Sequence, residues 1–367
     1  MLENEITPRI FIAATRQNDG KTTTSLGLVA ALRKRFHKVG YIKPVGQRYV
    51  EVSGLKIDED TVLINETYNP GLPLEAMSPI AISPNFTRDY LERGQPGELR
   101  ARVENAFNRA AWEQEFVVIE GSGHAGVGSV FDMSNAQVAS ALQSKAIIVS
   151  RGGVGGPIDE IALNLALFEK YRVPVVGVVL NKVQPSRIAE LRPYAEKGLA
   201  KLGLPLLGIV PFNGELRKPT MNQICQELGG RFIAGEKGKR RRVNKIHIVT
   251  MTSRHVEMLF DPNSLIIVAG DREDIVLAVL SANQASRQIA GVVLTHGMEP
   301  QPDIIRIMQA HSVPFIAVRQ EAYDVAAQIN DMTVKTEPGD NEKIALIQKL
   351  IEENVNIDAI ITAAWMK

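Results

Sequence analysis

The stretch "IFIAATRQNDGKTTTSLGLVAAL", residues 10–32, joins a strand pattern to a helix pattern through a short polar loop. The apolar run Ile10–Ile12 predicts a buried parallel strand, and apolar residues at helical spacing predict a helix that begins near Lys21. The loop between them, Ala14–Gly20, therefore leads into a helix start. A helix start presents unpaired backbone N–H groups and the positive end of the helix dipole, so this loop is suited to bind an anion.

The helix start carries the Gly-Lys-Thr of a phosphate-binding loop. We expect Lys21 to reach the β- and γ-phosphates of a nucleotide and the Thr22 hydroxyl to bind magnesium. In the usual GxxxxGK[ST] spacing the first glycine would fall at Thr15, so the general pattern is incomplete. The alternative is a helix capped by Asp19 with a solvated lysine. Strand, loop and helix in register favour the phosphate site, whose predicted residues are Thr15, Asn18, Gly20, Lys21, Thr22 and Thr23.

The bulk properties are those of an ordinary globular protein. The 367 residues are enough for two domains, and the net charge of +1 gives no sign of a nucleic-acid or membrane partner. A single cysteine, Cys225, excludes an intramolecular disulfide and fits a reducing compartment. No apolar run approaches the roughly 20 residues of a membrane span, and the polar N-terminus does not resemble a signal peptide. We therefore expect a cytoplasmic protein.

Strand and helix patterns alternate along the chain, which is typical of a parallel sheet covered on both faces. We place a domain boundary near residues 216–220, giving domains 1–218 and 219–367, the second with a C-terminal helix and tail. The basic run 239–242 follows the boundary and is read as a solvated loop, with RNA binding as the weaker alternative. The strands predicted after the first are Lys38–Ile42, Phe116–Glu120, Ala146–Ser150, Pro174–Leu180 and Leu206–Val210, then Ile246–Thr250, Leu265–Ala269, Gly291–Thr295 and Pro314–Val318.

Two acidic segments offer the oxygen ligands that magnesium requires. Glu120 ends the buried strand of "FVVIEGSGHAG", and a carboxylate at that end of a parallel strand belongs beside the phosphate loop. A solvent-exposed Glu at the strand end is the alternative. The segment "KIDEDTVLI" crowds Asp58, Glu59 and Asp60 together; one of them is suited to face a metal, and the others are suited to cap the helix that begins there.

Several spaced segments, namely "YIKPVGQ", "VVLNKVQP" and "IVPFN" together with the loop itself, are similar to motifs of one family. Residues 9–215 resemble the dethiobiotin synthetase-like P-loop proteins, which include the amidating cobyrinic acid synthases. The loop of that family is spaced G-T-x-x-x-x-G-K-T, so Ala14-Thr15 takes the place of Gly-Thr. The resemblance implies an α/β P-loop NTPase domain with a parallel sheet, and ATP and Mg²⁺ as cofactors.

The resemblance also implies roles for particular residues. Lys43 would lie near the substrate or the γ-phosphate, and Asp60 and Glu120 would join Thr22 as magnesium ligands. Asn181 would read the adenine and Pro211 would line the base. Arg16 stands five residues before Lys21, at the spacing of the signature lysine in related ATPases that act as dimers. We therefore expect a homodimer in which Arg16 lies near the partner's phosphates and contributes to catalysis, although a solvated arginine is an equally good interpretation.

Residues 216–356 resemble a DRTGG domain, a second and smaller α/β unit. "VAGDREDIVLAVLSA" supplies the Gly-Asp-Arg of that motif, with Glu273-Asp274 in place of Thr-Gly. Asp271 and Arg272 would follow a strand, where Arg272 offers a planar fork for a carboxylate or phosphate effector. The alternative is that these two residues pair with each other and only fix the turn.

The order of these two domains is that of the N-terminal half of long bacterial phosphotransacetylases. The acetyltransferase domain of those proteins has no counterpart in the 367 residues, so phosphotransacetylase activity is not expected of them. The leading hypothesis is an ATP-hydrolysing or ATP-sensing regulatory module for an enzyme of acetate or acyl-phosphate metabolism. A carboxylate–amine ligase acting on an unidentified small molecule is the first alternative, and a non-catalytic nucleotide-dependent scaffold is the second.

Overall fold

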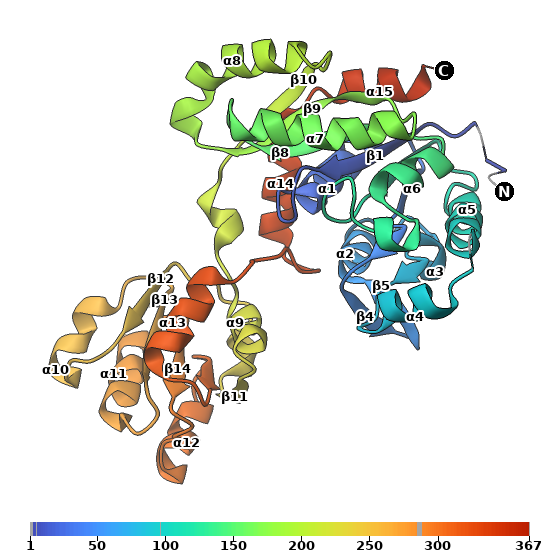
Figure 1. Ribbon diagram of the computed structural model, residues 1–367. Helices are drawn as coiled ribbons and strands as arrows, with labels where there is room; N and C mark the ends of the chain where they lie inside the picture. The colour runs from blue at the N-terminus through green and yellow to red at the C-terminus, as the bar shows by residue number, and fades with distance from the viewer. Residues whose placement is uncertain (1–2, 5, 96, 285–287, 367) are drawn as a thin grey trace. The chain divides into compact units, whose positions relative to one another are not determined.

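The computed structural model describes residues 3–4, 6–95, 97–284 and 288–366. The chain forms two compact units. The first unit comprises Met1–Asn213 together with Thr336–Lys367, and the second comprises Gly214–Lys335. Figure 1 shows the course of the chain through the elements of each unit.

The first unit is built on a parallel sheet of six strands in the order β10-β9-β8-β1-β7-β2. On one side of β1 lie β7 and then β2, and on the other side lie β8, β9 and β10. The chain passes from the first side to the second between β7 and β8, so the strand order reverses at β1. Ligands of open α/β sheets bind beyond the carboxyl ends of the strands at such a reversal. The strands are β1 (Arg9–Ala14), β2 (Val39–Ile42), β7 (Phe116–Glu120), β8 (Lys145–Arg151), β9 (Val175–Val183) and β10 (Leu206–Pro211).

Helices cover both faces of this sheet. Phe11 and Ala13 point from β1 into one core with side chains of α5, α6, α7 and α8, while α1 packs on the sheet at β1, β2 and β7. Burial on both faces explains why β1 is apolar from Ile10 to Ala14 and carries no alternating pattern. The helices before the second unit are α1 (Lys21–Arg33), α2 (Glu59–Tyr68), α3 (Leu74–Met77), α4 (Phe86–Arg93), α5 (Glu98–Ala110), α6 (Asn135–Ala141), α7 (Gly156–Lys170) and α8 (Ile188–Ala200).

Between β2 and α2 the chain adds small strands that the sequence pattern did not predict. β4 (Tyr49–Val52) and β5 (Leu55–Asp58) form an antiparallel hairpin, and β3 (Val45–Gly46) pairs with β6 (Ile80–Ala81). The hairpin brings Asp58 to the start of α2, where its carboxylate accepts a hydrogen bond of 2.9 Å from the Asp60 backbone N–H. Asp58 is thus the N-cap of this helix.

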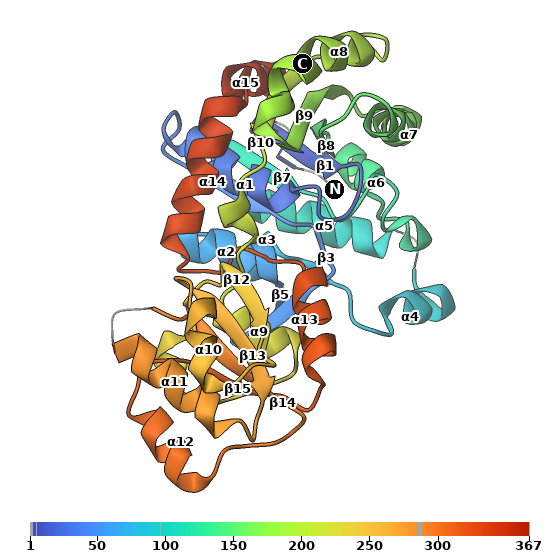
Figure 2. The same ribbon diagram turned by 90° about the vertical axis from the view of Figure 1, so that its left-hand side faces the viewer.

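The C-terminal segment lies in the first unit, which differs from the expected domain 219–367. In Figure 2, α14 (Asn341–Asn354) runs beside α1, and the two helices pack on each other. Ile351 of α14 is fully buried, and a Cβ at Gly27 of α1 would come within 2.4 Å of its side chain. The segment ends in α15 (Ile357–Trp365). An amphipathic helix pattern does not specify which core covers its apolar face. The predicted domain 219–367 therefore included this segment only because it follows the second unit in the chain.

The second unit contains a five-stranded sheet in the order β11-β15-β14-β13-β12, in which β11 alone runs antiparallel to its neighbour. Its two faces are covered by α10, α11 and α12 on one side and by α9 and α13 on the other. The strands are β11 (Arg231–Ala234), β12 (Lys245–Ile248), β13 (Ser264–Ala269), β14 (Gly291–Thr295) and β15 (Phe315–Ala317); the helices are α9 (Met221–Glu227), α10 (Ser253–Val256), α11 (Glu273–Gln284), α12 (Pro302–Gln309) and α13 (Ala322–Asp331).

The α/β fold class predicted from the sequence is confirmed for both units. Every predicted strand is present, with ends that differ from the prediction by three residues at most. In the part of the chain that the structure describes, no helix has both the length and the apolar character needed to cross a membrane.

Candidate functional site

The loop between β1 and α1 turns sharply into the helix at Gly20. Gly20 is the N-cap of α1 with a φ of 109°, a conformation that side chains of L-residues rarely adopt. A Cβ at this position would lie 2.0 Å from the Asn181 Nδ2 atom, so glycine is required for space as well as for backbone angle. Asn181, near the end of β9, donates a hydrogen bond of 2.9 Å to the Asp19 carbonyl oxygen. The residue predicted to read adenine therefore also supports the loop.

The front of the loop is held by side chains where a glycine is usual. The Thr15 hydroxyl lies 2.8 Å from Asp19 Oδ2 and 3.0 Å from the Ser150 hydroxyl oxygen. Arg151 donates a hydrogen bond of 2.9 Å to the other oxygen of Asp19, which is almost fully buried. Asp19 thus fixes the loop from inside instead of capping α1 as the alternative interpretation required, since no side-chain hydrogen bond caps the helix start.

Lys21 begins α1 and is buried. Its ammonium group donates a hydrogen bond of 3.0 Å to the carbonyl oxygen of Gly123, in the loop that follows β7. Burial lowers the pKa of Lys21 from 10.5 to about 8, against the attraction of Glu120, which raises it. A solvated lysine, the other alternative, does not describe this environment. Lys21 is therefore a buried lysine at the start of α1, held against the loop that follows β7.

Glu120 connects α1 to the end of β7. Its side chain is completely buried, which excludes the solvent-exposed alternative. The Thr22 hydroxyl donates a hydrogen bond of 2.9 Å to Oε1, and the Tyr41 hydroxyl donates one of 3.0 Å to Oε2. The Lys43 ammonium lies 3.4 Å from Oε1. Thr22, Lys43 and Glu120 are far apart in the sequence and meet here because the carboxyl ends of β1, β2 and β7 share one edge of the sheet.

Lys43 is surrounded by three carboxylates. It forms an ion pair with Asp60 and lies 3.2 Å from Asp58 and 3.4 Å from Glu120. Burial opposes the charge on Lys43, but Asp60, Glu120 and Asp58 outweigh this effect and raise its pKa well above the usual value. Burial raises the pKa of Asp58 to about 6 although Lys43 lowers it. The three carboxylates thus favour the charged form of Lys43 at this edge of the sheet.

The donors around Glu120 fit a magnesium ion. A carboxylate and a hydroxyl are hard oxygen ligands, and the three carboxylates near Lys43 exceed the two ammonium groups, of Lys21 and Lys43, by one negative charge. The described residues contain no set of three or more His, Cys, Asp and Glu side chains that would hold a metal alone. A magnesium ion beside Thr22, Glu120 and Asp60 would need further oxygen ligands from a nucleotide or from water, as is usual for this ion.

The remaining predicted residues lie in the loop, in the first turn of α1 and at the end of β10. Asn18 has a positive φ of 65°, and its carbonyl oxygen accepts a hydrogen bond from Lys182. Thr23 lies in the first turn of α1, and Pro211 is the half-buried end of β10 next to β9. The side chain of Arg16 is 66% exposed and forms an ion pair with Glu160 of α7. Arg16 thus points away from Lys21's buried surroundings.

Two asparagines with no motif of their own hold the loop after β7. Asn135, at the start of α6, accepts a hydrogen bond of 2.9 Å from the Ser122 N–H and donates bonds of 2.7 Å to the Ser122 and His124 carbonyl oxygens. Asn164 of α7 accepts one of 2.7 Å from the Ala125 N–H. These residues position the acceptor of Lys21. Neither asparagine was identified from the sequence, nor was Tyr41, whose hydroxyl donates to Glu120. No local pattern marks a polar residue whose hydrogen-bond partner is distant in the sequence.

In the second unit, Arg272 follows β13 as expected, but its partner is Asp274. Two nitrogens of the guanidinium donate to the two oxygens of Asp274 at 2.8 and 3.0 Å, and one of them also donates to the Met251 carbonyl oxygen at 2.9 Å. The hydrogen bonds from Arg272 lower the pKa of Asp274 to about 2. The residue that replaces the glycine of the motif thus occupies the fork that was predicted to bind an effector. Asp271 is exposed at the turn.

The reversal of strand order at β1, the loop into α1 and the convergence of Lys21, Thr22 and Glu120 define the P-loop class of α/β proteins. Within that class, the chain belongs to the family described as an AAA domain, whose sequence model matches residues 8–220. A second model, the DRTGG domain, matches residues 223–332. The predicted combination of a P-loop domain with a DRTGG domain is confirmed.

The chain is also similar to curated phosphate acetyltransferases. It is 28% identical over 377 residues to the enzyme from Pseudomonas putida, covering 97% of this chain and 51% of that protein. It is 26% identical over 361 residues to the enzyme from Nitrosomonas europaea, covering 96% and 51%. The chain thus spans about half the length of these relatives. Among solved structures, it is similar to the septum site-determining protein MinD complexed with Mg-ADP from Pyrococcus horikoshii, with 17% identity, a TM-score of 0.37, and coverage of 58% of this chain and 84% of that one.

Proposed function

We propose that the first unit binds Mg-ATP at the loop from Thr15 to Thr23. The observation that carries the proposal is the meeting of Lys21, Thr22 and Glu120 at the start of α1. The buried ammonium group of Lys21 would bind the β- and γ-phosphates, and backbone N–H groups of the first helical turn would supply further donors. Asn181 and Pro211 would lie at the base.

The same geometry supports ATP hydrolysis. Lys43 provides a second fixed cation close to Glu120, and a cation held in advance at the γ-phosphate stabilises negative charge that develops during phosphoryl transfer. Magnesium, when bound, would neutralise charge on the phosphate oxygens. This chain's own residues would hold the ion through Thr22, Asp60 and Glu120 and would exclude bulk water by burial. Arg16 of a second copy would supply an additional charge.

We further propose that ATP occupancy controls an enzyme of acetate or acyl-phosphate metabolism. This rests on the relatives, which are phosphate acetyltransferases matched over about half of their length. The second unit would bind a small regulatory ligand near Asp271 and Arg272, after displacement of Asp274 from the guanidinium. Phosphate acetyltransfer itself would belong to the part of those relatives that this chain does not match.

Isothermal titration of ATP into the Lys21→Ala protein tests the site. Lys21→Ala removes a buried ammonium group and leaves a good helix former, so affinity should fall at least a hundredfold while the circular dichroism spectrum stays unchanged. The matched control is Lys34→Ala at the other end of α1, where the lysine is exposed and pairs with Glu352. Equal ATP affinity in the folded Lys21→Ala and Lys34→Ala proteins would refute the proposed site.

A ligase of the dethiobiotin synthetase type would use the same two lysines to activate a carboxylate. The two functions differ in what releases ADP. A ligase releases ADP only when its carboxylate substrate is added, whereas the proposed regulator releases it slowly alone and responds to the enzyme it controls. ADP release with no added acid, lost in Lys21→Ala, supports the regulator.

A further inference from the structure

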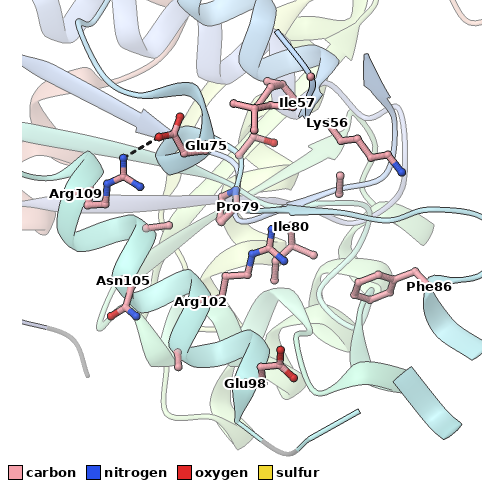
Figure 3. Close-up of a pocket in the computed structure, with 16 residues that line it drawn as sticks. Lys56, Ile57, Glu75, Pro79, Ile80, Phe86, Glu98, Arg102, Asn105 and Arg109 are labelled. Carbon is pink, nitrogen blue, oxygen red and sulfur yellow. Dashed lines mark hydrogen bonds and ion pairs between the residues drawn. The ribbon is translucent and has the colours of Figure 1, made fainter. Parts of the chain in front are cut away.

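One cavity of the first unit lies away from the phosphate loop. It has a volume of about 750 Å³ and is bordered by α5, the β5 strand, the segment around β6, and Phe86 at the start of α4 (Figure 3). None of the residues predicted to bind nucleotide or magnesium lines it. Its volume falls within the range of small-molecule sites, roughly 300–1,000 Å³.

The floor of this cavity is apolar. Ile57 of β5 and Ile80 of β6 are almost fully buried, and Pro79 lies between the two elements. Phe86 closes one side and is fixed by an edge-to-face contact with Phe131, with 5.2 Å between ring centroids. Such a floor stabilises the apolar part of a ligand by removing it from water.

The rim carries polar and charged groups from one face of α5, with Glu98 one turn before Arg102. Arg102, Asn105 and Arg109 recur at helical spacing and line the cavity, while Val103 and Phe107 of the same helix face the core. Arg109 forms an ion pair of 2.9 Å with Glu75, drawn as a dashed line in Figure 3.

Arg102 differs from Arg109 in having no partner among the described residues. Its guanidinium forms no hydrogen bond or ion pair there, and in Figure 3 its side chain extends from α5 toward Ile80. A planar fork of donors without a partner, placed over an apolar floor, is suited to an anionic head group.

We propose that this cavity binds a small organic anion, with a carboxylate or phosphate at Arg102 and an apolar group on Ile57, Pro79 and Ile80. The cavity shares an element with the acidic cluster around Lys43. Asp58 directly follows Ile57 in β5, and its backbone N–H donates a hydrogen bond of 3.0 Å to the hydroxyl of Ser78, which lines the cavity. A ligand on this floor would therefore contact the strand that positions Asp58.

The test uses the full chain and two aromatic anions as probes, phenyl phosphate and phenylacetate, in isothermal titration. Inorganic phosphate and benzyl alcohol represent the head and the apolar part alone. We expect at least one aromatic anion to bind tenfold or more tightly than either partial probe. The Lys21→Ala background separates this cavity from the phosphate loop, so the proposal does not depend on ATP binding.

Arg102→Ala should weaken that binding at least tenfold in the Lys21→Ala background, and Arg102→Glu should weaken it further. Arg93→Ala is the matched control, because Arg93 is an exposed arginine of α4 that does not line the cavity. The proposal is overturned if both aromatic anions bind no more tightly than the partial probes. It is also overturned if binding disappears with Lys21→Ala, or if Arg102→Ala and Arg93→Ala behave alike.

Discussion

The Thr22 hydroxyl donates a hydrogen bond of 2.9 Å to an oxygen of Glu120, and the same oxygen lies 3.4 Å from the Lys43 ammonium. One carboxylate oxygen of a fully buried side chain is therefore shared by the helix start and by the lysine that directly follows β2. This arrangement makes Glu120 the residue on which the magnesium assignment depends most directly.

Glu120→Gln should abolish magnesium-dependent ATP turnover and leave the fold intact. The amide keeps the size of the side chain but lacks the charge that a divalent cation requires. The measurement is the ATP hydrolysis rate as a function of magnesium concentration, with Glu113→Gln as an exposed control. If Glu120→Gln hydrolyses ATP with the magnesium dependence of the unmodified protein, the ligand assignment is wrong.

ATP affinity should decrease as the pH rises through about 8, the pKa of Lys21 in the ligand-free protein. Above this pH the amine of Lys21 is largely neutral in the free protein, and the triphosphate favours its charged form, so ATP binding takes up a proton. Titrations in buffers of different ionisation enthalpy measure that uptake, which Lys21→Ala should eliminate. Absence of proton uptake above pH 8 in the unmodified protein would contradict the assignment.

The effect of Lys21 on folding has the opposite sign. Because its pKa in the folded protein is lowered from 10.5 to about 8, the unfolded chain binds more protons between these two values. Lys21 should therefore make the free energy of unfolding rise with pH across this window. Denaturant titrations of the unmodified and Lys21→Ala proteins at both ends of the window give the difference.

Gly20→Ala should destabilise the protein and weaken ATP binding more than Gly54→Ala does. Both glycines have positive φ angles, 109° and 80°, so both substitutions cost roughly 1 kcal/mol or more in backbone strain. Only at Gly20 does the new Cβ meet a side chain, that of Asn181, whereas nothing lies within 4 Å at Gly54. Equal losses of stability in thermal unfolding, and equal ATP affinities, would show that the Asn181 contact does not matter.

Ile351→Ala should lower the free energy of unfolding of the first unit by about 2–5 kcal/mol, the usual cost of truncating a buried isoleucine. Ile351 packs on α1, the helix that begins at Lys21, so the substitution should also lower the affinity for ATP. Leu91→Ala, at a side chain that is 66% exposed, is the control. If Ile351→Ala lowers the free energy of unfolding no more than Leu91→Ala does, α14 contributes little to the stability of this unit.

ATP should promote a homodimer of the chain through the first unit. The side chain of Arg16 is 66% exposed and pairs with Glu160 of α7, and Leu163, one helical turn after Glu160, is 76% exposed. Light scattering with and without ATP measures the mass, and Leu163→Glu should prevent dimer formation. A monomer at every concentration tested, with ATP present, would exclude this arrangement.

Much of the first unit could be predicted because short, local sequence patterns specify its strands and helices. The strand before Ala14, the helix after Gly20 and the acid at Glu120 each follow from short patterns, and parallel strands bring their carboxyl ends to one edge without further instruction. The roles of Asn135 and Asn164 could not be predicted in this way. Each bonds to backbone atoms of a loop that is distant in the sequence, so only the folded geometry identifies it.

The acidic segment before α2 shows the same limit. Sequence patterns indicated that some of its carboxylates cap the helix, and Asp58 does so. The pattern contained no sign that Asp58 also lies beside Lys43, because the apolar and polar alternation of the β4 and β5 segments does not specify which distant side chain the end of the hairpin meets. A short hairpin therefore determines one contact of the buried cluster around Lys43.

The return of α14 to the first unit has a consequence for how the protein is made. Translation proceeds from the N-terminus, so the ribosome must synthesise all of Gly214–Lys335 before the helix that covers α1 exists. Within the second unit, Gln223 of α9 donates a hydrogen bond of 2.8 Å to the Lys335 carbonyl oxygen, so the chain leaves that unit beside the helix near which it entered. Folding of the inserted unit thus shortens the effective loop that α14 must close, and it reduces the entropy lost when α14 joins the nascent first unit.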